Sequence, residues 1–380
     1  MSRRVLFHVQ HLLGIGHWRR AALIARGLAA AGLEVTVLSG GPPEPGEAEP
    51  FQIVQLPAAH AADATFKTIV DEHGRPIDEA FRAARRERAL AALAAHRPHV
   101  LLIESYPFGR RAFRFELEPL IAAARAAAPR PAIIASIRDV LVARDDPKRA
   151  AEIITTVRRD FAAVLVHGDP ALVPLGASFP NAAEIADKLH YTGYVCADAA
   201  AIPAEGDGAG EVIVSAGGGG VGLPLLRAAL AARPLSPLAA ARWRLLAGPH
   251  LPEADFAALT VALPEGVVLE RFRPDFPALL RRSALSISQA GYNTTLDLLA
   301  AGARAIVVPF AAERETEQAL RAALLAARGA LHVVPEAELS GPRLAAAIAA
   351  ALAAPRPAMP SLRRDGARQS AAFIAALAGG

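Results

Sequence analysis

Cysteine is nearly absent from this 380-residue chain, which has only Cys196. A single thiol cannot close an intramolecular disulfide, so small disulfide-stapled secreted folds are excluded and a reducing cytoplasm is the expected compartment. No apolar run approaches the roughly 20 uncharged residues that a membrane-spanning helix needs. The basic, partly apolar start of the chain has no small-residue cleavage site after a sustained apolar core, so it reads as a first strand and turn rather than a signal peptide.

An excess of charge of either sign is also lacking. The 41 basic residues, almost all arginine, face 37 acidic ones, for a formal net charge of +4. This charge is small for so long a chain and gives no reason to expect a nucleic-acid partner. The high arginine and alanine content fits a GC-rich genome, and the length allows two domains that each bury a core.

Apolar strand patterns alternate with helical patterns along the chain. The opening reads as a strand at 4–9, a glycine-containing turn, an amphipathic helix that stops at Gly32, and a strand at 34–39. Such a βαβ unit predicts an α/β fold with a parallel sheet and with ligands at the carboxyl ends of the strands. Further strands are expected at 51–56, 100–103, 132–137, 163–167, 188–194, 211–215, 242–247, 267–269, 284–287, 305–309 and 331–334. The small, patternless residues 196–210 predict a hinge linker between a domain at 1–195 and a domain at 211–360.

The first glycine turn reads G-I-G-H-W-R. Arg19 stands where a dinucleotide fingerprint has its third glycine, which disfavours an NAD enzyme. His17 follows Gly16 at the start of the helix, and an imidazole there is suited to take a proton from a hydroxyl near neutral pH. A ligand contact without proton transfer and a helix cap are the other interpretations of His17. A metal site built with its neighbours His8 and His11 has no known ligand spacing, and we expect none.

Two later strand ends in the first half also present polar or aromatic side chains. Arg138 and Asp139 follow a predicted strand, where the carboxylate is placed to orient His17 or to act as the base, or else to form a structural pair with Arg138. Phe108 lies in a segment where aromatic and basic residues interleave. We interpret this segment either as an acceptor or membrane-surface contact or as phenylalanines that pack the following helix against the sheet.

The second half begins with a strand and the turn A-G-G-G-G-V-G. Its glycines, Gly217, Gly218 and Gly219 among them, let backbone N–H groups approach a phosphate, although the lysine and the Ser/Thr of a P-loop are missing. A second small-residue turn, at 289–291, precedes a helical pattern that runs from Thr294 to Ala301. A helix start of this kind presents free N–H groups and a partial positive charge to an anion such as a diphosphate. Asp297 is placed to accept bonds from hydroxyl groups of the same ligand, or to act as a helix-dipole partner.

The order of parts from 288 to 318 resembles the nucleotide-sugar site of GT-B glycosyltransferases: a turn, a helix with an acid, Ala-Ala-Gly, a strand ending in Val-Pro-Phe, and a loop ending in Gln318. The similarity is greatest to the MurG family of peptidoglycan N-acetylglucosaminyltransferases and related bacterial enzymes, and the turn at 14–17 is similar to the Gly-x-Gly-His turn of that group. The resemblance implies two Rossmann-like doubly wound domains facing a central cleft. It also implies a C-terminal helix, at 361–380, that packs back on the N-terminal, acceptor-binding domain.

The same resemblance implies a role for each matching residue. The diphosphate would contact Gly16, Gly217, Gly218, Gly219, Gly291, Asn293 and Thr294; the nucleoside would contact Phe272 and Asp297; the donor sugar would contact Glu313, Glu315 and Gln318; and Arg138 and Phe108 would lie on the acceptor side. Asp297 departs from the glutamate that is usual in the family, and its reach is about one methylene shorter.

The implied activity is transfer of a sugar from a nucleoside diphosphate sugar, UDP-linked by family likeness, to a hydroxyl of a small-molecule, glycan or lipid acceptor. His17 would be the base, with Asp139 as the alternative. No cofactor or metal is expected, because backbone amides at the glycine turns would stabilise the leaving diphosphate. A peripheral contact with the inner face of a membrane would suit a lipid acceptor. A nucleotide-sugar hydrolase or epimerase, and a non-catalytic nucleotide-sugar binding protein, remain alternatives.

Overall fold

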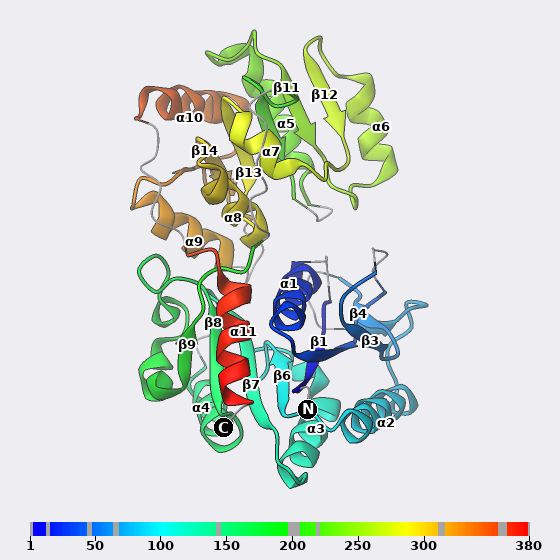
Figure 1. Cartoon of the computed structure of the whole chain (residues 1–380). Helices are drawn as coiled ribbons and strands as arrows, with labels where there is room; N and C mark the ends of the chain where they lie inside the picture. The colour runs from blue at the N-terminus through cyan, green and yellow to red at the C-terminus, as the bar shows by residue number, and fades with distance from the viewer. Residues whose placement is uncertain are drawn as a thin grey trace. The chain divides into compact units, whose positions relative to one another are not determined.

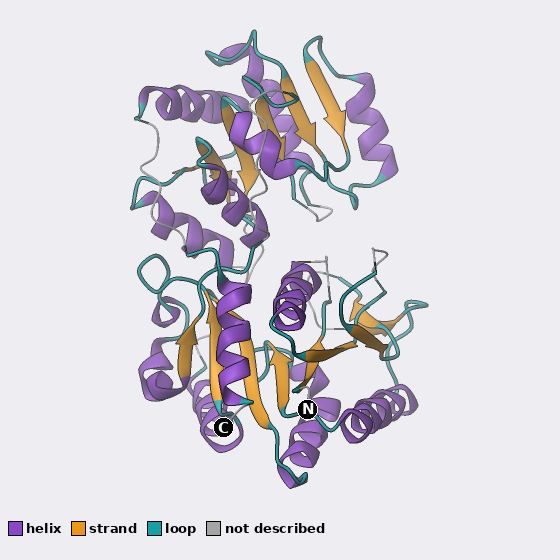
Figure 2. Cartoon of the chain, viewed as in Figure 1, coloured by secondary structure: helices purple, strands orange, loops and turns teal. Residues whose placement is uncertain are grey.

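The computed structural model describes residues 3–12, 16–43, 48–63, 68–141, 146–196, 206–217, 221–310, 316–355 and 363–378. The chain divides into two compact units (Figure 1). Unit 1 comprises residues 1–197 and 363–380, and unit 2 comprises residues 198–362. Each unit is a parallel sheet with helices on both faces (Figure 2), so the predicted α/β class with two Rossmann-like domains is confirmed.

Unit 1 is built on a seven-stranded sheet in the order β3-β2-β1-β6-β7-β8-β9. Its strands are β1 (Arg4–Val9), β2 (Glu34–Ser39), β3 (Gln52–Gln55), β6 (Val100–Glu104), β7 (Ala132–Arg138), β8 (Ala163–His167) and β9 (Leu189–Tyr191); a small antiparallel pair, β4 (Ala59–Ala61) and β5 (Ile69–Asp71), lies apart from this sheet. The central strands are continuous apolar runs because both faces of a parallel sheet are covered. Strands β2 and β3 extend the sheet on one side of β1, and the chain then returns to add β6 on the other side of β1. The carboxyl ends of β1 and β6 are therefore the topological switch point, where ligands bind in such folds.

The helices of unit 1 form two apolar layers. They are α1 (Gly16–Ala30), α2 (Glu79–His96), α3 (Arg114–Ala126), α4 (Pro147–Asp160) and α11 (Gly366–Leu377), with 3₁₀ segments at Arg111–Phe113, Leu175–Ala177 and Pro180–Lys188. Two of the helix starts are capped by aspartates whose side chains accept a bond from a first-turn amide, Asp78 from Phe81 N and Asp146 from Arg149 N. Helices α1 and α11 share one apolar cluster with the sheet, and α2, α3 and α4 share the other.

The C-terminal helix belongs to unit 1, as Figure 1 shows for α11. A short bridge holds its start: Tyr194 N donates to Arg363 O at 2.7 Å, and Gly366 N donates to Tyr194 O at 3.0 Å. A Cβ at Gly366 would lie 2.5 Å from Gly193 O and 2.7 Å from Tyr194 C. The start of α11 therefore packs so closely against the backbone of residues 193 and 194 that only glycine fits at position 366.

We expect Gly366→Val to destabilise unit 1 by about 1–3 kcal/mol, because the added side chain meets backbone atoms that cannot move aside. Chemical denaturation followed by circular dichroism measures the change. Gly176→Ala is the matched control, since a Cβ at Gly176 meets nothing within 4 Å. Equal stabilities of the two variants would contradict the docking role of Gly366.

Unit 2 has a six-stranded parallel sheet in the order β12-β11-β10-β13-β14-β15. The strands are β10 (Val212–Ser215), β11 (Trp243–Leu246), β12 (Val267–Glu270), β13 (Leu285–Gln289), β14 (Ala305–Val308) and β15 (His332–Val333). The helices are α5 (Leu223–Ala232), α6 (Glu253–Val261), α7 (Phe276–Arg282), α8 (Tyr292–Ala301), α9 (Glu317–Ala326) and α10 (Gly341–Ala353), with 3₁₀ segments at Arg233–Leu235 and Glu336–Glu338. The switch point of this sheet is the edge between β10 and β13, where the two predicted diphosphate turns follow.

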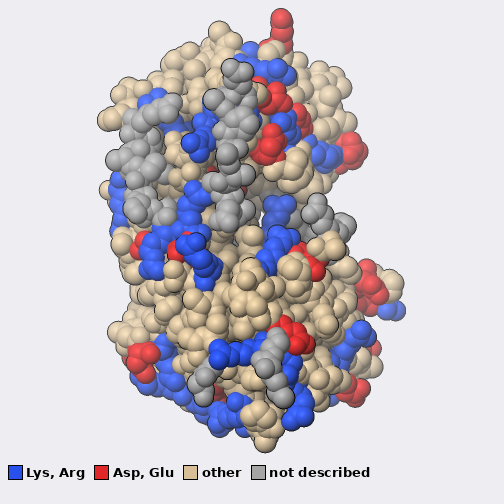
Figure 3. Space-filling model, in the orientation of Figure 1, with Lys and Arg blue, Asp and Glu red and all other residues tan. Residues whose placement is uncertain are grey.

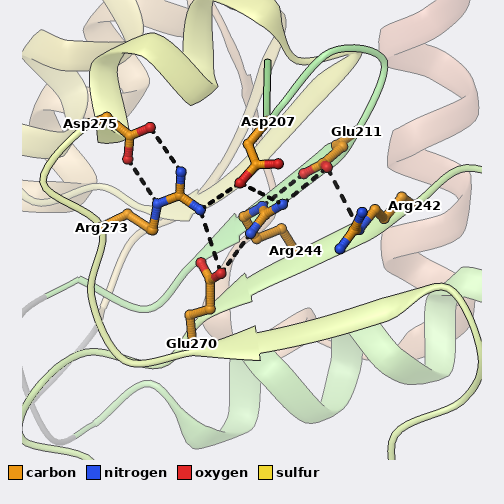
Figure 4. A network of polar contacts seen from close by, with 7 residues as sticks. All are labelled: Asp207, Glu211, Arg242, Arg244, Glu270, Arg273 and Asp275. Carbon is orange, nitrogen blue, oxygen red and sulfur yellow. Dashed lines mark hydrogen bonds and ion pairs between the residues drawn. The ribbon is translucent and has the colours of Figure 1, made fainter.

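The predicted hinge linker at 196–210 is wrong for its last five residues, which are folded into unit 2. Gly210 N donates to Arg282 O at 3.2 Å, and a Cβ at Gly208 would lie 2.8 Å from Leu279 O. Asp207 pairs with Arg273 at 2.8 Å and with the buried Arg244 at 3.4 Å. These ion pairs are part of a network that also includes Glu211, Arg242, Glu270 and Asp275 (Figure 4). The small residues that suggested flexibility instead allow a close approach to α7, and residues 197–205 lie outside the described part of the chain.

Long apolar helices and groups of surface charge bear on the expected membrane contact. Among the described residues, no helix is both long and apolar enough to cross a bilayer. On the face drawn in Figure 3, the basic side chains occur in several separate groups, some of them beside acidic residues.

Candidate active site

His17 and Glu104 meet at the switch point of the unit 1 sheet. His17 is the second residue of α1, and Glu104 is the last residue of β6. The His17 Nδ1 atom lies 2.6 Å from Glu104 Oε1, and the two side chains are 19% and 1% exposed. Sequence reasoning found His17 but did not assign Glu104 a role. The available signal was an acid at the carboxyl end of an apolar strand.

The Glu104 Oε1 atom is surrounded by donors. Besides His17 Nδ1, it lies 2.5 Å from Arg20 Nη2 and 2.8 Å from Ser105 Oγ. A carboxylate oxygen only accepts, so we assign the proton of the neutral imidazole to Nδ1. The Nε2 atom of His17 then carries the lone pair that can accept a proton from a substrate hydroxyl.

Electrostatics favour an ionised acid and a neutral base. Burial alone would raise the pKa of Glu104, but the adjacent His17, Arg110 and Arg20 outweigh it and hold that pKa well below its usual range. Burial lowers the pKa of His17 to about 3, with Arg110 and Arg138 acting in the same direction and Glu104 opposing them. At neutral pH the ring is therefore unprotonated, as a general base must be.

Asp139 is not the carboxylate that hydrogen-bonds to His17 in the structure. It follows β7 and is fully buried; its Oδ1 atom accepts a bond from Val140 N at 2.8 Å, and a Cβ at Gly168 would lie 2.5 Å from the Asp139 Cβ. The carboxylate that contacts the His17 ring is Glu104. Arg138 ends β7 at the same edge of the sheet and acts on His17 through its charge.

Phe108 is part of the core, which corrects its prediction as an acceptor-side residue. It is 7% exposed and packs edge to face on Phe179, with ring centroids 5.5 Å apart. Phe113 is fully buried. Of the two interpretations of this segment, packing of the phenylalanines is the one that the structure supports, because their apolar area gains more from the core than from solvent.

In unit 2, the small-residue turn leads directly into α8. Gly291 is the N-cap, so the helix begins two residues earlier than the pattern predicted and places Asn293 and Thr294 in its first turn. The first-turn amides lack partners within the helix and are available to an anion. Asp297 lies in the next turn and is half-buried.

The other predicted donor residues follow neighbouring strands of unit 2. Gly217 has φ 71°, and a Cβ there would lie 3.5 Å from Gln289 Oε1, so the turns after β10 and β13 adjoin. Gln318 spans from α9 to the end of β14, where its Oε1 atom accepts a bond from Phe310 N at 3.1 Å. Phe272 is 54% exposed after β12. Gly218, Gly219, Glu313 and Glu315 lie outside the described residues.

Part of this chain matches a known protein family. Residues 245–372 match the glycosyltransferase family 28 C-terminal domain. Curated relatives include two enzymes named UDP-N-acetylglucosamine–N-acetylmuramyl-(pentapeptide) pyrophosphoryl-undecaprenol N-acetylglucosamine transferase. The one from Exiguobacterium sibiricum is 34% identical over 99 residues, which is 26% of this chain and 27% of the relative. The one from Brucella anthropi is 38% identical over 85 residues, which is 22% of this chain and 23% of the relative. The chain thus aligns with about a quarter of the length of these relatives.

Solved structures match over the whole chain. The calicheamicin glycosyltransferase CalG4 has a TM-score of 0.61 at 16% identity and covers 100% of this chain and 96% of its own. The spinosyn rhamnosyltransferase SpnG in complex with thymidine diphosphate has a TM-score of 0.60 at 17% identity, with coverage of 100% and 96%. At such identities the likeness shows the fold. The chain therefore has the GT-B fold of glycosyltransferases, as its resemblance to the MurG family predicted, and residues 245–372 match the family 28 C-terminal domain.

Proposed function

We propose that the protein is a glycosyltransferase that moves a sugar from a nucleoside diphosphate sugar to a hydroxyl acceptor. The observation that carries the proposal is the His17–Glu104 pair at the switch point of a GT-B unit, 2.6 Å apart and flanked by arginines. His17 Nε2 takes the proton of the acceptor hydroxyl, and the oxygen then attacks the anomeric carbon as the bond to the diphosphate breaks. The Glu104 carboxylate keeps the ring oriented and stabilises the imidazolium that forms.

The donor site of the proposal lies in unit 2. Amides of Gly217, Gly291, Asn293 and Thr294 bind the diphosphate and stabilise its developing charge without a metal ion. Asp297 accepts bonds from the ribose hydroxyls. The names of the curated relatives favour a UDP-linked donor, whereas SpnG, a neighbour in fold only, was solved with thymidine diphosphate.

The acceptor is proposed more broadly, as a small molecule, a glycan or a lipid that enters from unit 1. A lipid acceptor entails a peripheral contact with the inner face of a membrane. The experiment that separates transfer from the alternatives is product analysis with and without acceptors. Free sugar released from the donor alone, at the rate seen with acceptors, would identify a hydrolase, and a changed sugar still linked to the nucleotide would identify an epimerase.

Donor binding gives a direct test of the unit 2 site. We expect UDP to raise the melting temperature more than GDP, TDP or NAD, because a ligand that binds only the folded state stabilises it by mass action. In Asp297→Ala, loss of charge-assisted bonds to the ribose should weaken UDP binding by about 1.5–3 kcal/mol, or roughly 10- to 150-fold. Titration calorimetry measures the change, with the exposed Glu253→Ala as control. Stabilisation by NAD alone would overturn the proposal.

A further inference from the structure

Arg20 lies against the proposed catalytic pair in unit 1. It follows His17 by three residues on α1, so both side chains project from the same face of the helix. Both reach the same Glu104 oxygen, Arg20 Nη2 at 2.5 Å and His17 Nδ1 at 2.6 Å. The two nitrogens are 3.3 Å apart, and with the Nδ1 proton directed at Glu104 they are neighbouring donors rather than partners.

The ion pair between Arg20 and Glu104 is buried. Its side chain is 2% exposed and Glu104 is 1% exposed, so each charge depends on the other for compensation. A lone buried carboxylate beside an imidazole would draw a second proton onto the ring. With the Arg20 guanidinium bound to the same oxygen, the carboxylate stays ionised and still accepts the hydrogen bond from His17 Nδ1. The positive charge of Arg20 cancels part of the attraction that the carboxylate would exert on a second proton at His17 Nε2.

Other titratable groups near the pair lie on or just after β1, β6, β7 and β8. Arg110, with φ 59°, places Nη2 3.5 Å from Glu104 Oε2, and Arg138 adds a positive charge from the end of β7. His11, which follows β1, and His167, on β8, have pKa values lowered by burial and are neutral at pH 7. Glu104 is the carboxylate that contacts His17, and Arg20 makes the shortest contact with it.

We infer that Arg20 is a positioning residue that keeps Glu104 ionised and holds its Oε1 atom against His17 Nδ1, so that Nε2 of His17 remains free to accept a proton. This inference rests on the proposed role of His17 as the base. It explains why His17 stays neutral although the carboxylate of Glu104 lies beside its ring.

The test is a pH titration of the full-length protein labelled with ¹⁵N-histidine, read by NMR with no substrate present. The His17 signals are assigned by their loss in His17→Gln. In the wild type we expect the Nδ1–H tautomer and a pKa below the ordinary 6.5. In Arg20→Gln the pKa of His17 should rise by about 1 unit or more, because the carboxylate is no longer offset. Arg20→Lys should keep the pKa of His17 close to its wild-type value, because the positive charge beside Glu104 remains.

The matched control is Arg19→Gln, which removes an equal charge from the exposed neighbouring position of α1 and should leave the titration unchanged. If Arg20→Gln does not fold, the pKa and tautomer of His17 in the wild type still test the inference. A wild-type His17 that titrates at or above 6.5, or carries its proton on Nε2, overturns the inference, as does an unchanged pKa in a folded Arg20→Gln. Since no turnover is measured, failure of the proposed function would appear separately, as absence of transfer by a protein whose His17 titrates as expected.

Discussion

Replacing His17 with alanine should slow sugar transfer by about 10²- to 10⁴-fold, the usual contribution of a positioned general base. The loss should appear in kcat with little change in the binding of UDP, because His17 is not among the residues proposed to bind the nucleotide. Steady-state transfer rates and UDP titrations measure the two effects. His73→Ala is the control, since the ring of this unit 1 histidine is 65% exposed and lies 3.8 Å from the exposed Glu72.

The pH dependence of transfer follows from the same residue. Burial lowers the pKa of His17 to about 3, and the proposed base is active when its ring is neutral. The rate should therefore be flat from about pH 8 to pH 5 and fall only as the pH drops toward the folded pKa. An ordinary histidine base would instead show a fall near 6.5. A wild-type profile that bends there, or His17→Ala with nearly full activity, would reject His17 as the base.

Replacing Arg85 with methionine should lower the free energy of unfolding of unit 1 by about 3–5 kcal/mol, the cost of breaking a buried ion pair from one side. Arg85 is fully buried and donates to both oxygens of Glu116, at 2.6 and 2.7 Å, and to Gln10 Oε1 at 2.7 Å. It also donates to the carbonyls of Gly40 and Pro57, at 2.8 and 2.6 Å. Its loss leaves a buried carboxylate that His8 still contacts, and it removes a donor from Gln10 Oε1 and Pro57 O, whereas Gly40 O still accepts from Ala59 N.

Denaturant unfolding measures this cost, and the neighbouring position on α2 provides its control. Arg86 is 34% exposed and lies 3.7 Å from Glu79, so Arg86→Met should cost less than about 1 kcal/mol. Arg85→Met combined with Glu116→Gln should cost less than the sum of the two single changes, because no unpaired buried charge remains. Equal stabilities of Arg85→Met and Arg86→Met would show that the buried network contributes no more than a surface pair.

Several elements were predictable because their signals are local. The glycine turns, the apolar strand runs and the periodic helices each occupy a short window of sequence, and they placed the parallel sheets and the starts of α1 and α8 correctly to within a few residues. The prediction of a hinge was wrong for residues 206–210 because it rested on composition. Glycine permits both flexibility and close packing, and composition alone does not distinguish them.

The alternation of strands and helices, and hence the two parallel α/β units, follows from the local residue pattern, which also puts His17 at the start of a helix after the first strand. Which acid contacts that histidine depends on the folded chain. Glu104 is 87 positions away, and it becomes the neighbour of His17 because the sheet order sets β6 beside β1. Asp139, which follows the next strand, β7, is fully buried and accepts a bond from Val140 N. The inward position of Arg20 and the burial of Phe108 are likewise results of packing, since contacts between distant segments depend on how the whole chain folds.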